Sequence, residues 1–267
     1  MGNEMGHETP ETQLEVQPLL SAIDLCKSYG GLRAVDRVSI QVPSGSITGL
    51  IGPNGAGKTT LFNLLCNFAH PDSGQVTFDG APIHTLPSHQ ISQKGLVRTF
   101  QVARVLSRLS VMENMLLAAQ HQTGEKFWNV WFRPGQTQKE ERQQREYASE
   151  ILASVGLSAM AQSYAGALSG GQRKLLEIAR ALMVRPKMIL LDEPAAGVNP
   201  TLINQICEHI TQWNQAGITF LIIEHNMDVI MSLCDRVWVL AEGQNLASGT
   251  PIEIQQDPLV LKAYLGQ

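Results

Sequence analysis

Charged side chains are scarce in this sequence. They make up 16% of the 267 residues, whereas soluble domains carry about 25%. Aromatic residues are also few, at 6%. The 20 Lys and Arg and the 24 Asp and Glu leave a formal net charge of −4, which argues against a dedicated nucleic-acid binder with its basic face. The hydrophobic fraction of 43% excludes a disordered or fibrous chain.

Cysteine is rare, and its four copies lie far apart. Cys26, Cys66, Cys207 and Cys234 form no C-x-x-C pair, so the spacing indicates neither a zinc site nor a redox motif. Unclustered thiols in a chain of this length suit a reducing cytosol, where cysteine behaves as a small apolar residue.

The sequence contains no apolar run that would form a transmembrane helix. The uncharged stretch 38–57 contains Pro43, Gly45, Gly49 and Pro53, which are incompatible with a spanning helix. Residues 1–18 contain early acids and no apolar core of a signal peptide. We expect them to form a flexible polar tail.

Strand-like and helix-like stretches alternate over most of the chain. Residues 188–191, 218–223 and 237–240 are apolar runs typical of parallel strands covered on both faces. A helical pattern dominates from Val111 to about Gly156 and interrupts the alternation. The pattern therefore predicts a parallel sheet with covering helices and one helical insertion.

Two features of the helical insertion are distinctive. Glu141 and Arg145 are four residues apart, as in a solvated helical face with an ion pair. The segment 127–132 is unusually aromatic. It is either a local packing cluster of the insertion or a contact surface for a partner.

A glycine-rich segment supplies the first candidate site. It follows the strand predicted at 46–51, opens a helix, and matches the pattern G-x-x-x-x-G-K-[ST] of a phosphate-binding loop. Glycines let backbone N–H groups turn toward phosphate oxygens, the lysine neutralises the β- and γ-phosphates, and the threonine hydroxyl reaches Mg²⁺. The alternative is a chance glycine-rich turn. The segment consists of Gly52, Pro53, Asn54, Gly55, Ala56, Gly57, Lys58 and Thr59.

A second candidate follows the apolar run 188–191. Asp192 and Glu193 come directly after it, and ligands of parallel sheets bind at the carboxyl ends of strands. Asp192 would reach Mg²⁺ largely through its water shell, and Glu193 would polarise the attacking water. An ordinary turn after a strand is the alternative reading.

The run Leu168–Gln172 is the most informative. Ser169 and Gln172 form a capping-box pattern, which alone indicates the start of a helix. Two adjacent glycines, Gly170 and Gly171, destabilise the first turn of a helix relative to alanine. They make sense where a ligand approaches the backbone closely, and a γ-phosphate at the helix N-terminus would do so.

Taken together and in this order, these motifs make the chain resemble the ATP-binding subunit of ABC transporters over about residues 20–267. The resemblance implies an α/β fold: a P-loop NTPase core with a mainly parallel sheet, an N-terminal antiparallel β subdomain and an inserted α-helical subdomain. It implies one ATP-binding domain over residues 19–267, with the catalytic core at 19–97 and 167–267 and the helical subdomain at 98–166.

The resemblance also assigns roles to single residues. Gln101 falls at the Q-loop, which senses Mg²⁺ and the γ-phosphate. His225 falls at the switch histidine, and Tyr29 where an aromatic ring stacks on adenine. It implies catalytic roles for Glu193, His225 and Gln101, and metal contacts for Thr59, Gln101 and Asp192. Nucleotide contacts would come from Tyr29, residues 52–59, Thr60, Ser169, Gly170, Gly171 and Gln172.

One departure from the family pattern lies after Glu193. The family's D-loop usually carries an aspartate, and this chain has Asn199 in the matching region. An asparagine can still form a hydrogen bond across a subunit interface, but it lacks the charge.

Several segments resemble the ATPases of branched-chain and neutral amino-acid importers, and urea importers are similar in these places. The segments are 98–101, 195–200, 224–228, 248–251 and 263–266. The resemblance implies ATP and Mg²⁺ as cofactors, and a second ATPase subunit, identical or related, that completes each nucleotide site. It implies two membrane permeases, a substrate-binding protein, and a peripheral place on the cytoplasmic face of the inner membrane. A lipopolysaccharide-export ATPase and a non-hydrolysing nucleotide-gated module are the alternatives, and the cargo is not named by these residues.

Overall fold

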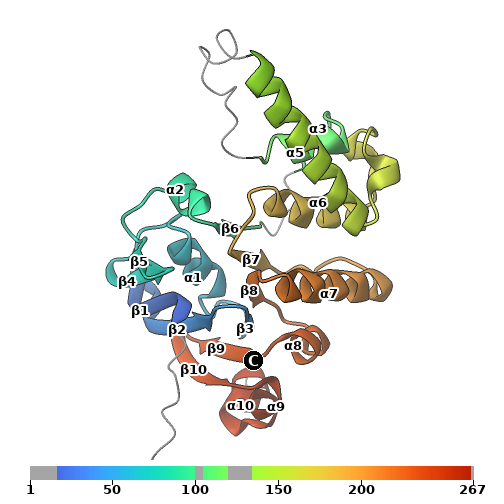
Figure 1. Cartoon of the computed structure of the whole chain (residues 1–267). Helices are drawn as coiled ribbons and strands as arrows, with labels where there is room; N and C mark the ends of the chain where they lie inside the picture. The colour runs from blue at the N-terminus through green and yellow to red at the C-terminus, as the bar shows by residue number, and fades with distance from the viewer. Residues whose placement is uncertain (1–16, 100–104, 120–133, 266–267) are drawn as a thin grey trace, which may run out of the picture.

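The computed structural model describes residues 17–99, 105–119 and 134–265. Two β-sheets lie against each other, and a helical part projects from one end of the larger sheet (Figure 1). This is the α/β architecture expected from the sequence, with an antiparallel sheet, a mainly parallel sheet and inserted helices. The aromatic segment 127–132, Gln101 and residues 1–16 of the expected tail lie outside the described residues.

The smaller sheet is antiparallel and comes from the N-terminal part of the chain. Its strand order is β2-β1-β4-β5. The turn between β1 and β2 falls at Gly30–Gly31, and Gly30 has a φ of +58°. The strands are β1 (Pro18–Tyr29), β2 (Leu32–Pro43), β4 (Ser73–Phe78) and β5 (Ala81–Pro82).

The larger sheet has the strand order β10-β9-β3-β8-β7-β6. Every neighbouring pair from β9 to β6 is parallel, and β10 pairs antiparallel with β9 at the edge. The strands are β3 (Ile47–Ile51), β6 (Leu96–Arg98), β7 (Met188–Asp192), β8 (Thr219–Ile223), β9 (Arg236–Ala241) and β10 (Gln244–Gly249).

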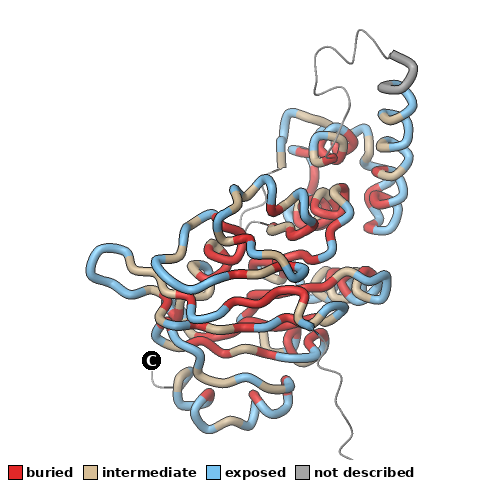
Figure 2. The backbone as a smooth tube through the Cα atoms, turned by 60° about the vertical axis from the view of Figure 1, so that its left-hand side comes forward, coloured by how far each residue is buried: buried red, intermediate tan, exposed pale blue. Residues whose placement is uncertain are grey.

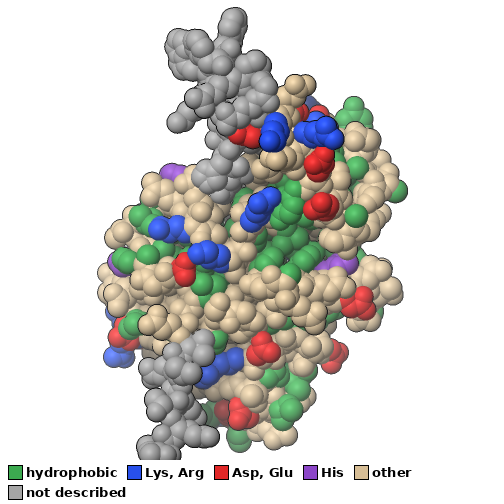
Figure 3. Space-filling view, viewed as in Figure 1, with side chains coloured by type: hydrophobic (Ala, Val, Ile, Leu, Met, Phe, Trp, Pro, Cys, Tyr) green, Lys and Arg blue, Asp and Glu red, His purple; other side chains and the backbone are tan. Residues whose placement is uncertain are grey.

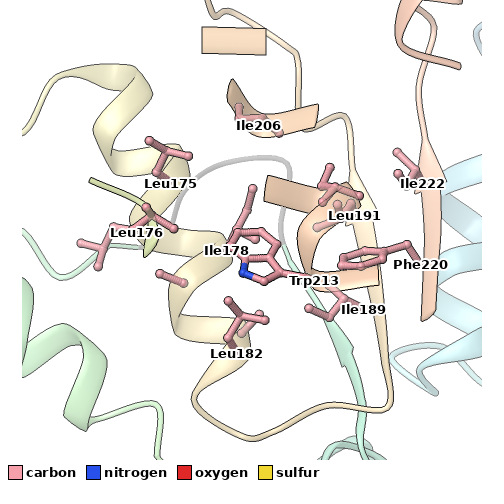
Figure 4. Packing of buried hydrophobic residues seen from close by; sticks show 14 of the residues in the cluster. Leu175, Leu176, Ile178, Leu182, Ile189, Leu191, Ile206, Trp213, Phe220 and Ile222 are labelled. Atoms are coloured by element: carbon pink, nitrogen blue, oxygen red, sulfur yellow. The ribbon is translucent and has the colours of Figure 1, made fainter. Parts of the chain in front are cut away.

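The central strands are buried on both faces, which explains their uninterrupted apolar sequence. Ile189 and Leu191 of β7 point into the core beneath α6 and α7 (Figure 4). Met188 and Leu190 point to the opposite face, into the core shared with α1 and the antiparallel sheet. Alternation along a strand thus splits one apolar run between two cores.

Helices cover both faces of the larger sheet. Helix α1 packs on the face shared with the antiparallel sheet, and α6 and α7 pack on the other. The helices are α1 (Lys58–Leu65), α2 (Ser88–Gln93), α3 (Val111–Leu116), α5 (Pro134–Ser154), α6 (Gly170–Leu182), α7 (Pro200–Gln215), α8 (Met227–Leu233), α9 (Pro251–Gln256) and α10 (Pro258–Leu265), with short 3₁₀ turns η2 (Ser158–Met160) and η3 (Ala165–Ala167).

The inserted helices share a core with the rest of the chain. Met115 of α3 and Leu152 of α5 belong to the same buried cluster as Leu176 of α6. Residues 138–146 of α5 are largely exposed (Figure 2). Ala148 is the first fully buried residue among the described side chains of this helix. The expected ion pair is confirmed there, with Arg145 Nη2 at 3.2 Å from Glu141 Oε1.

The surface next to the inserted helices contains a band of apolar side chains. On the face seen in Figure 3, these side chains gather between the projecting helices and the sheet with α7.

None of the helices in the described part of the chain combines the length and the apolar composition needed to cross a membrane.

Asn199, the residue that replaces the family's aspartate, caps helix α7. Its side chain accepts a hydrogen bond from the backbone N–H of Leu202 at 2.9 Å, and Pro200 occupies the first turn. Asparagine and aspartate are both strong N-caps, and proline is favoured at the first helical position. The substitution therefore preserves the start of α7 while removing a charge.

We expect Asn199→Ala to lower the free energy of unfolding by about 1 kcal/mol, because the backbone N–H of Leu202 loses its side-chain acceptor. Asn199→Asp keeps an acceptor at the same place and is the matched control. Urea denaturation followed by circular dichroism measures both variants. Equal losses in the two variants would contradict the capping role.

Candidate active site

Three adjacent parallel strands end at one edge of the larger sheet, and each delivers predicted site residues there. The glycine-rich loop 52–57 follows β3, Asp192 is the last residue of β7, and His225 comes two residues after β8. These strands lie side by side in the order β3-β8-β7. Because parallel strands bring their carboxyl ends to one edge, residues far apart in sequence meet at this place.

The backbone of the loop 52–57 requires glycine at its two ends. Gly57 has a φ of +97°, and a Cβ atom there would lie 2.4 Å from the carbonyl oxygen of Ala34. A Cβ atom on Gly52 would lie 2.1 Å from the carbonyl oxygen of Leu240. The glycines therefore let the loop pack against β2 and β9 and turn into α1. This is the geometry that the phosphate-loop hypothesis requires.

Lys58 lies over this loop. Its Nζ atom donates hydrogen bonds to the carbonyl oxygens of Gly52 at 2.7 Å and Pro53 at 2.9 Å. Burial lowers the pKa of Lys58 from its usual value, and the carboxylates of Glu193 and Asp192 act in the opposite direction. The loop lysine thus lies within electrostatic reach of the two carboxylates.

Asp192 is held by a buried ion pair. Only 2% of the residue is exposed, and its Oδ2 atom accepts a hydrogen bond from Arg98 Nη2 at 2.8 Å. Arg98 is the last residue of β6, which pairs with β7 in parallel. A buried carboxylate without a counter-charge is strongly unfavourable, so this pair fixes a charged side chain at the strand end.

Glu193 and His225 approach each other at the same edge. His225 Nδ1 lies 3.9 Å from Glu193 Oε1, and the imidazole is well exposed. Glu193 has a φ of +49°, and its backbone N–H donates to the carbonyl oxygen of Ile223 at 3.0 Å. A left-handed backbone is rare for a glutamate and is found at functional sites where the surroundings hold it.

Glu224 directly precedes His225 and contacts the segment that follows Glu193. It is completely buried. Its Oε1 accepts from the backbone N–H of Ala195 at 2.8 Å, and its Oε2 accepts from the N–H groups of His225 at 3.1 Å and Asn226 at 3.3 Å. One carboxylate thus joins the backbone after β7 to the backbone after β8.

The run 168–172 opens helix α6 with the predicted capping box. Ser169 Oγ accepts from the backbone N–H of Gln172 at 3.2 Å, and Gln172 Oε1 accepts from the backbone N–H of Ser169 at 2.9 Å. The space beside Gly170 is open, whereas a Cβ atom on Gly171 would lie 1.9 Å from Leu202 Cδ2 of α7. Close packing against α7 therefore accounts for Gly171, and the open backbone at Gly170 remains the place where a ligand could approach.

This run lines a groove that the loop 52–57 does not reach. Ser169 and Gln172 line a groove with the end of α5 and the first turns of α7. Of the described residues that line it, none belongs to the loop 52–57 or to the pair 192–193.

The remaining predicted residues are more dispersed. Tyr29 ends β1 with 49% of the residue exposed, and Lys27 Nζ lies 5.6 Å from the centre of its ring. Thr59 is exposed in the first turn of α1, and Thr60 follows it, partly buried. Gln101 lies outside the described residues.

The oxygen donors at the strand edge fit a magnesium ion that arrives with a nucleotide. Over residues 17–99, 105–119 and 134–265, no three His, Cys, Asp or Glu side chains gather as a metal-binding group. A carboxylate at Asp192 and a hydroxyl at Thr59 are hard oxygen ligands. Mg²⁺ is commonly bound by one or two such ligands, with phosphates and water supplying the rest.

Comparisons with known proteins identify the family. A model described as "ABC transporter" matches residues 35–196, more than half of the chain. The chain belongs to the ABC transporter family. A second model, described as "Branched-chain amino acid ATP-binding cassette transporter", matches residues 244–267. This ABC protein is an ATPase whose hydrolysis is coupled to transport, and it is a cassette of the branched-chain amino acid type.

Individual relatives agree with this family. The high-affinity branched-chain amino acid transport ATP-binding protein BraF of Pseudomonas aeruginosa is 41% identical over 252 residues, which cover 94% of this chain and 99% of that protein. A crystal structure of a nucleotide-free ATP-binding cassette from an ABC transporter has a TM-score of 0.81 at 38% identity, covering 94% of this chain and 100% of that chain. The ADP conformation of an ABC transporter cassette gives 0.80 at 37% identity, again with 94% and 100% coverage. The expected fold class is confirmed.

Sequence reasoning missed two contributors to this site of the ABC cassette. Arg98 and Glu224 are both charged residues at or next to the carboxyl end of a short apolar strand. A charge in that position is the signal that could have found them, because a side chain there reaches the ligand edge of the sheet.

We expect Glu224→Gln to lower the free energy of unfolding by about 2 kcal/mol. A glutamine has one side-chain oxygen, so its NH₂ group must face a backbone N–H of Ala195 or His225. Glu208→Gln changes an exposed carboxylate of α7 in the same way and is the control. Chemical denaturation measures both, and a loss no larger than that of the control would contradict the anchoring role of Glu224.

Proposed function

We propose that this ABC cassette hydrolyses ATP to drive the uptake of branched-chain or neutral amino acids through membrane permeases. The observation that carries the proposal is the convergence of Lys58, Asp192, Glu193 and His225 at the carboxyl ends of β3, β7 and β8. The cargo class is supported by the similarity to BraF, a branched-chain amino acid transport protein, and to the branched-chain amino acid cassette family.

Each residue at the strand edge has a distinct task in this proposal. The loop 52–57 and Lys58 bind the phosphates of ATP, and Thr59 and Thr60 follow at the start of α1. Thr59, Asp192 and Gln101 hold Mg²⁺, which neutralises the charge that develops on the phosphates. Glu193 accepts the proton of the attacking water, and His225 contacts the γ-phosphate. Tyr29 stacks on adenine.

A second cassette completes each nucleotide site. Ser169, Gly170, Gly171 and Gln172 of one chain face the γ-phosphate bound by the other chain. Two features of α6 support this: the open backbone at Gly170, and an N-terminus whose groove contains none of the described residues of the loop 52–57. A helix of 13 residues presents a positive dipole end there. Whether the partner is identical or related is open.

The remaining partners follow from the family. A substrate-binding protein supplies the cargo, and two permeases form its path through the membrane. The cassette binds peripherally at the cytoplasmic face of the membrane. The helical subdomain, which we assign to residues 98–166, passes the motion of the nucleotide site to the permeases. Its projection from the core in Figure 1 supports this arrangement. The flanking segments 19–97 and 167–267 form the catalytic core.

We expect Glu193→Gln to retain ATP binding and to lower hydrolysis by at least about 100-fold, because the general base is lost. ATP should then accumulate in a closed dimer. Phosphate release and size-exclusion chromatography with Mg²⁺ and ATP measure the two effects.

The control is the double variant Glu193→Gln, Ser169→Arg. The bulky cation at Ser169 should block dimerisation while leaving ATP binding to each chain unchanged. Unaltered hydrolysis in the single variant, with no gain of dimer, would contradict the role given to Glu193.

A transport assay tests the cargo. Co-expression with the permeases and the binding protein should give a complex in proteoliposomes that accumulates leucine, isoleucine or valine when ATP is enclosed. The same complex with Glu193→Gln is the matched control and should accumulate none. Accumulation of urea instead, or co-purification with lipopolysaccharide-export components, would favour the alternative functions.

A further inference from the structure

Arg98 joins three segments of the nucleotide site. It ends β6, its Nη2 atom donates to Asp192 Oδ2 of β7 at 2.8 Å, and its Nη1 atom donates to Asn63 Oδ1 of α1 at 2.6 Å. The guanidinium also lies 5.6 Å from the ring centre of Phe62 and 6.0 Å from that of Phe68. The helix that follows the phosphate loop and the strand that carries the magnesium ligand therefore share one arginine.

The contact fixes the orientation of the Asp192 carboxylate. The side chain of Arg98 is 6% exposed and that of Asp192 is 3% exposed, so the pair is shielded from solvent. A planar guanidinium held by two acceptors and flanked by aromatic rings has little freedom to rotate. It engages Oδ2 of Asp192 and leaves Oδ1 as the carboxylate oxygen outside this contact.

Arg98 also affects what Lys58 can do. Both carboxylates at the strand edge act electrostatically on Lys58, whose Nζ atom is bound to the loop carbonyls of Gly52 and Pro53. A buried Asp192 without Arg98 would need another cation, and Lys58 is a cation on which Asp192 already acts electrostatically. In the structure Asp192 is paired with Arg98, and Lys58 is bound to the loop carbonyls.

We propose that Arg98 is a positioning residue for the magnesium carboxylate. By holding Oδ2 of Asp192, it aims this side chain at the cation that accompanies ATP and leaves Lys58 to the phosphates. The proposal rests on the proposed function, which assigns Asp192 to Mg²⁺. A purely structural role would instead support β6 and α1 without any link to the metal.

The test compares the affinity for a fluorescent ATP analogue in excess Mg²⁺ and in EDTA. The ratio of the two dissociation constants is the magnesium advantage. We expect Arg98→Met to reduce this advantage about tenfold, as for other directly coupled neighbours. Arg98→Lys keeps the positive charge but lacks the planar set of donors of a guanidinium. Its magnesium advantage should lie between those of Arg98→Met and the parent chain. It keeps the test decisive if Arg98→Met does not fold.

A double-mutant cycle separates positioning from support of the fold. Asp192→Asn alone should remove most of the magnesium advantage, and Arg98→Met added to it should remove no more. Asn63→Ala, which deletes the other acceptor of the guanidinium, should give a smaller loss of the same kind.

Three results would overturn the proposal. Arg98→Met could weaken binding equally in Mg²⁺ and in EDTA, or its effect could add fully to that of Asp192→Asn. Either result would leave the assignment of Asp192 standing and refute only the role of Arg98. An unchanged magnesium advantage in Asp192→Asn would instead refute the metal role of Asp192 in the proposed function, and with it the proposal.

Discussion

Burial of the central strands on both faces is the constraint on which the rest of this ABC cassette depends. Ile189 and Leu191 face one core and Met188 and Leu190 the other, so β7 has no face left for polar chemistry. A side chain that must meet a ligand therefore lies at the last strand residue or just after it. Asp192, Glu224 and His225 all lie at that limit. The sheet therefore gathers the site at one edge without any sequence proximity between its parts.

The charges at this edge bear on the proposed binding of a nucleotide together with Mg²⁺. Lys58 and Arg98 bring two positive charges, and Asp192, Glu193 and Glu224 bring three negative ones. Arg98 is engaged by Asp192, and Glu224 is engaged by backbone N–H groups. Lys58 alone could not offset a triphosphate beside Glu193. A bound Mg²⁺ would compensate the phosphates and use the oxygen of Asp192 that Arg98 leaves outside its contact.

Local signals predicted much of this cassette, and long-range contacts account for what they missed. The phosphate loop, the apolar strands and the capping box at Ser169 each depend on residues a few positions apart, so periodicity and turn chemistry reveal them. The pairing of Arg98 with Asp192 spans 94 residues and follows from strand order, which one sequence does not encode locally. Gly171 adds a contact of the same long-range kind. The sequence suggested a ligand as the reason for both glycines, and the structure adds a packing reason at Gly171, where Leu202 of α7 lies in the place of the missing Cβ atom.

The segment after β7 connects Glu193, the proposed general base, to α7, and through α7 to the start of α6. Glu193 has a left-handed backbone held by the carbonyl of Ile223, and two residues later Ala195 is held by Glu224. Four residues beyond, Asn199 caps α7, and Leu202 in the first turn of that helix packs on Gly171 of α6. Because these contacts follow one another from Glu193 to Gly171, we expect a displacement of residues 195–199 to alter both ends. Replacing the family's aspartate by Asn199 keeps this mechanical link through the N-cap, and what it changes is the charge offered to a second subunit.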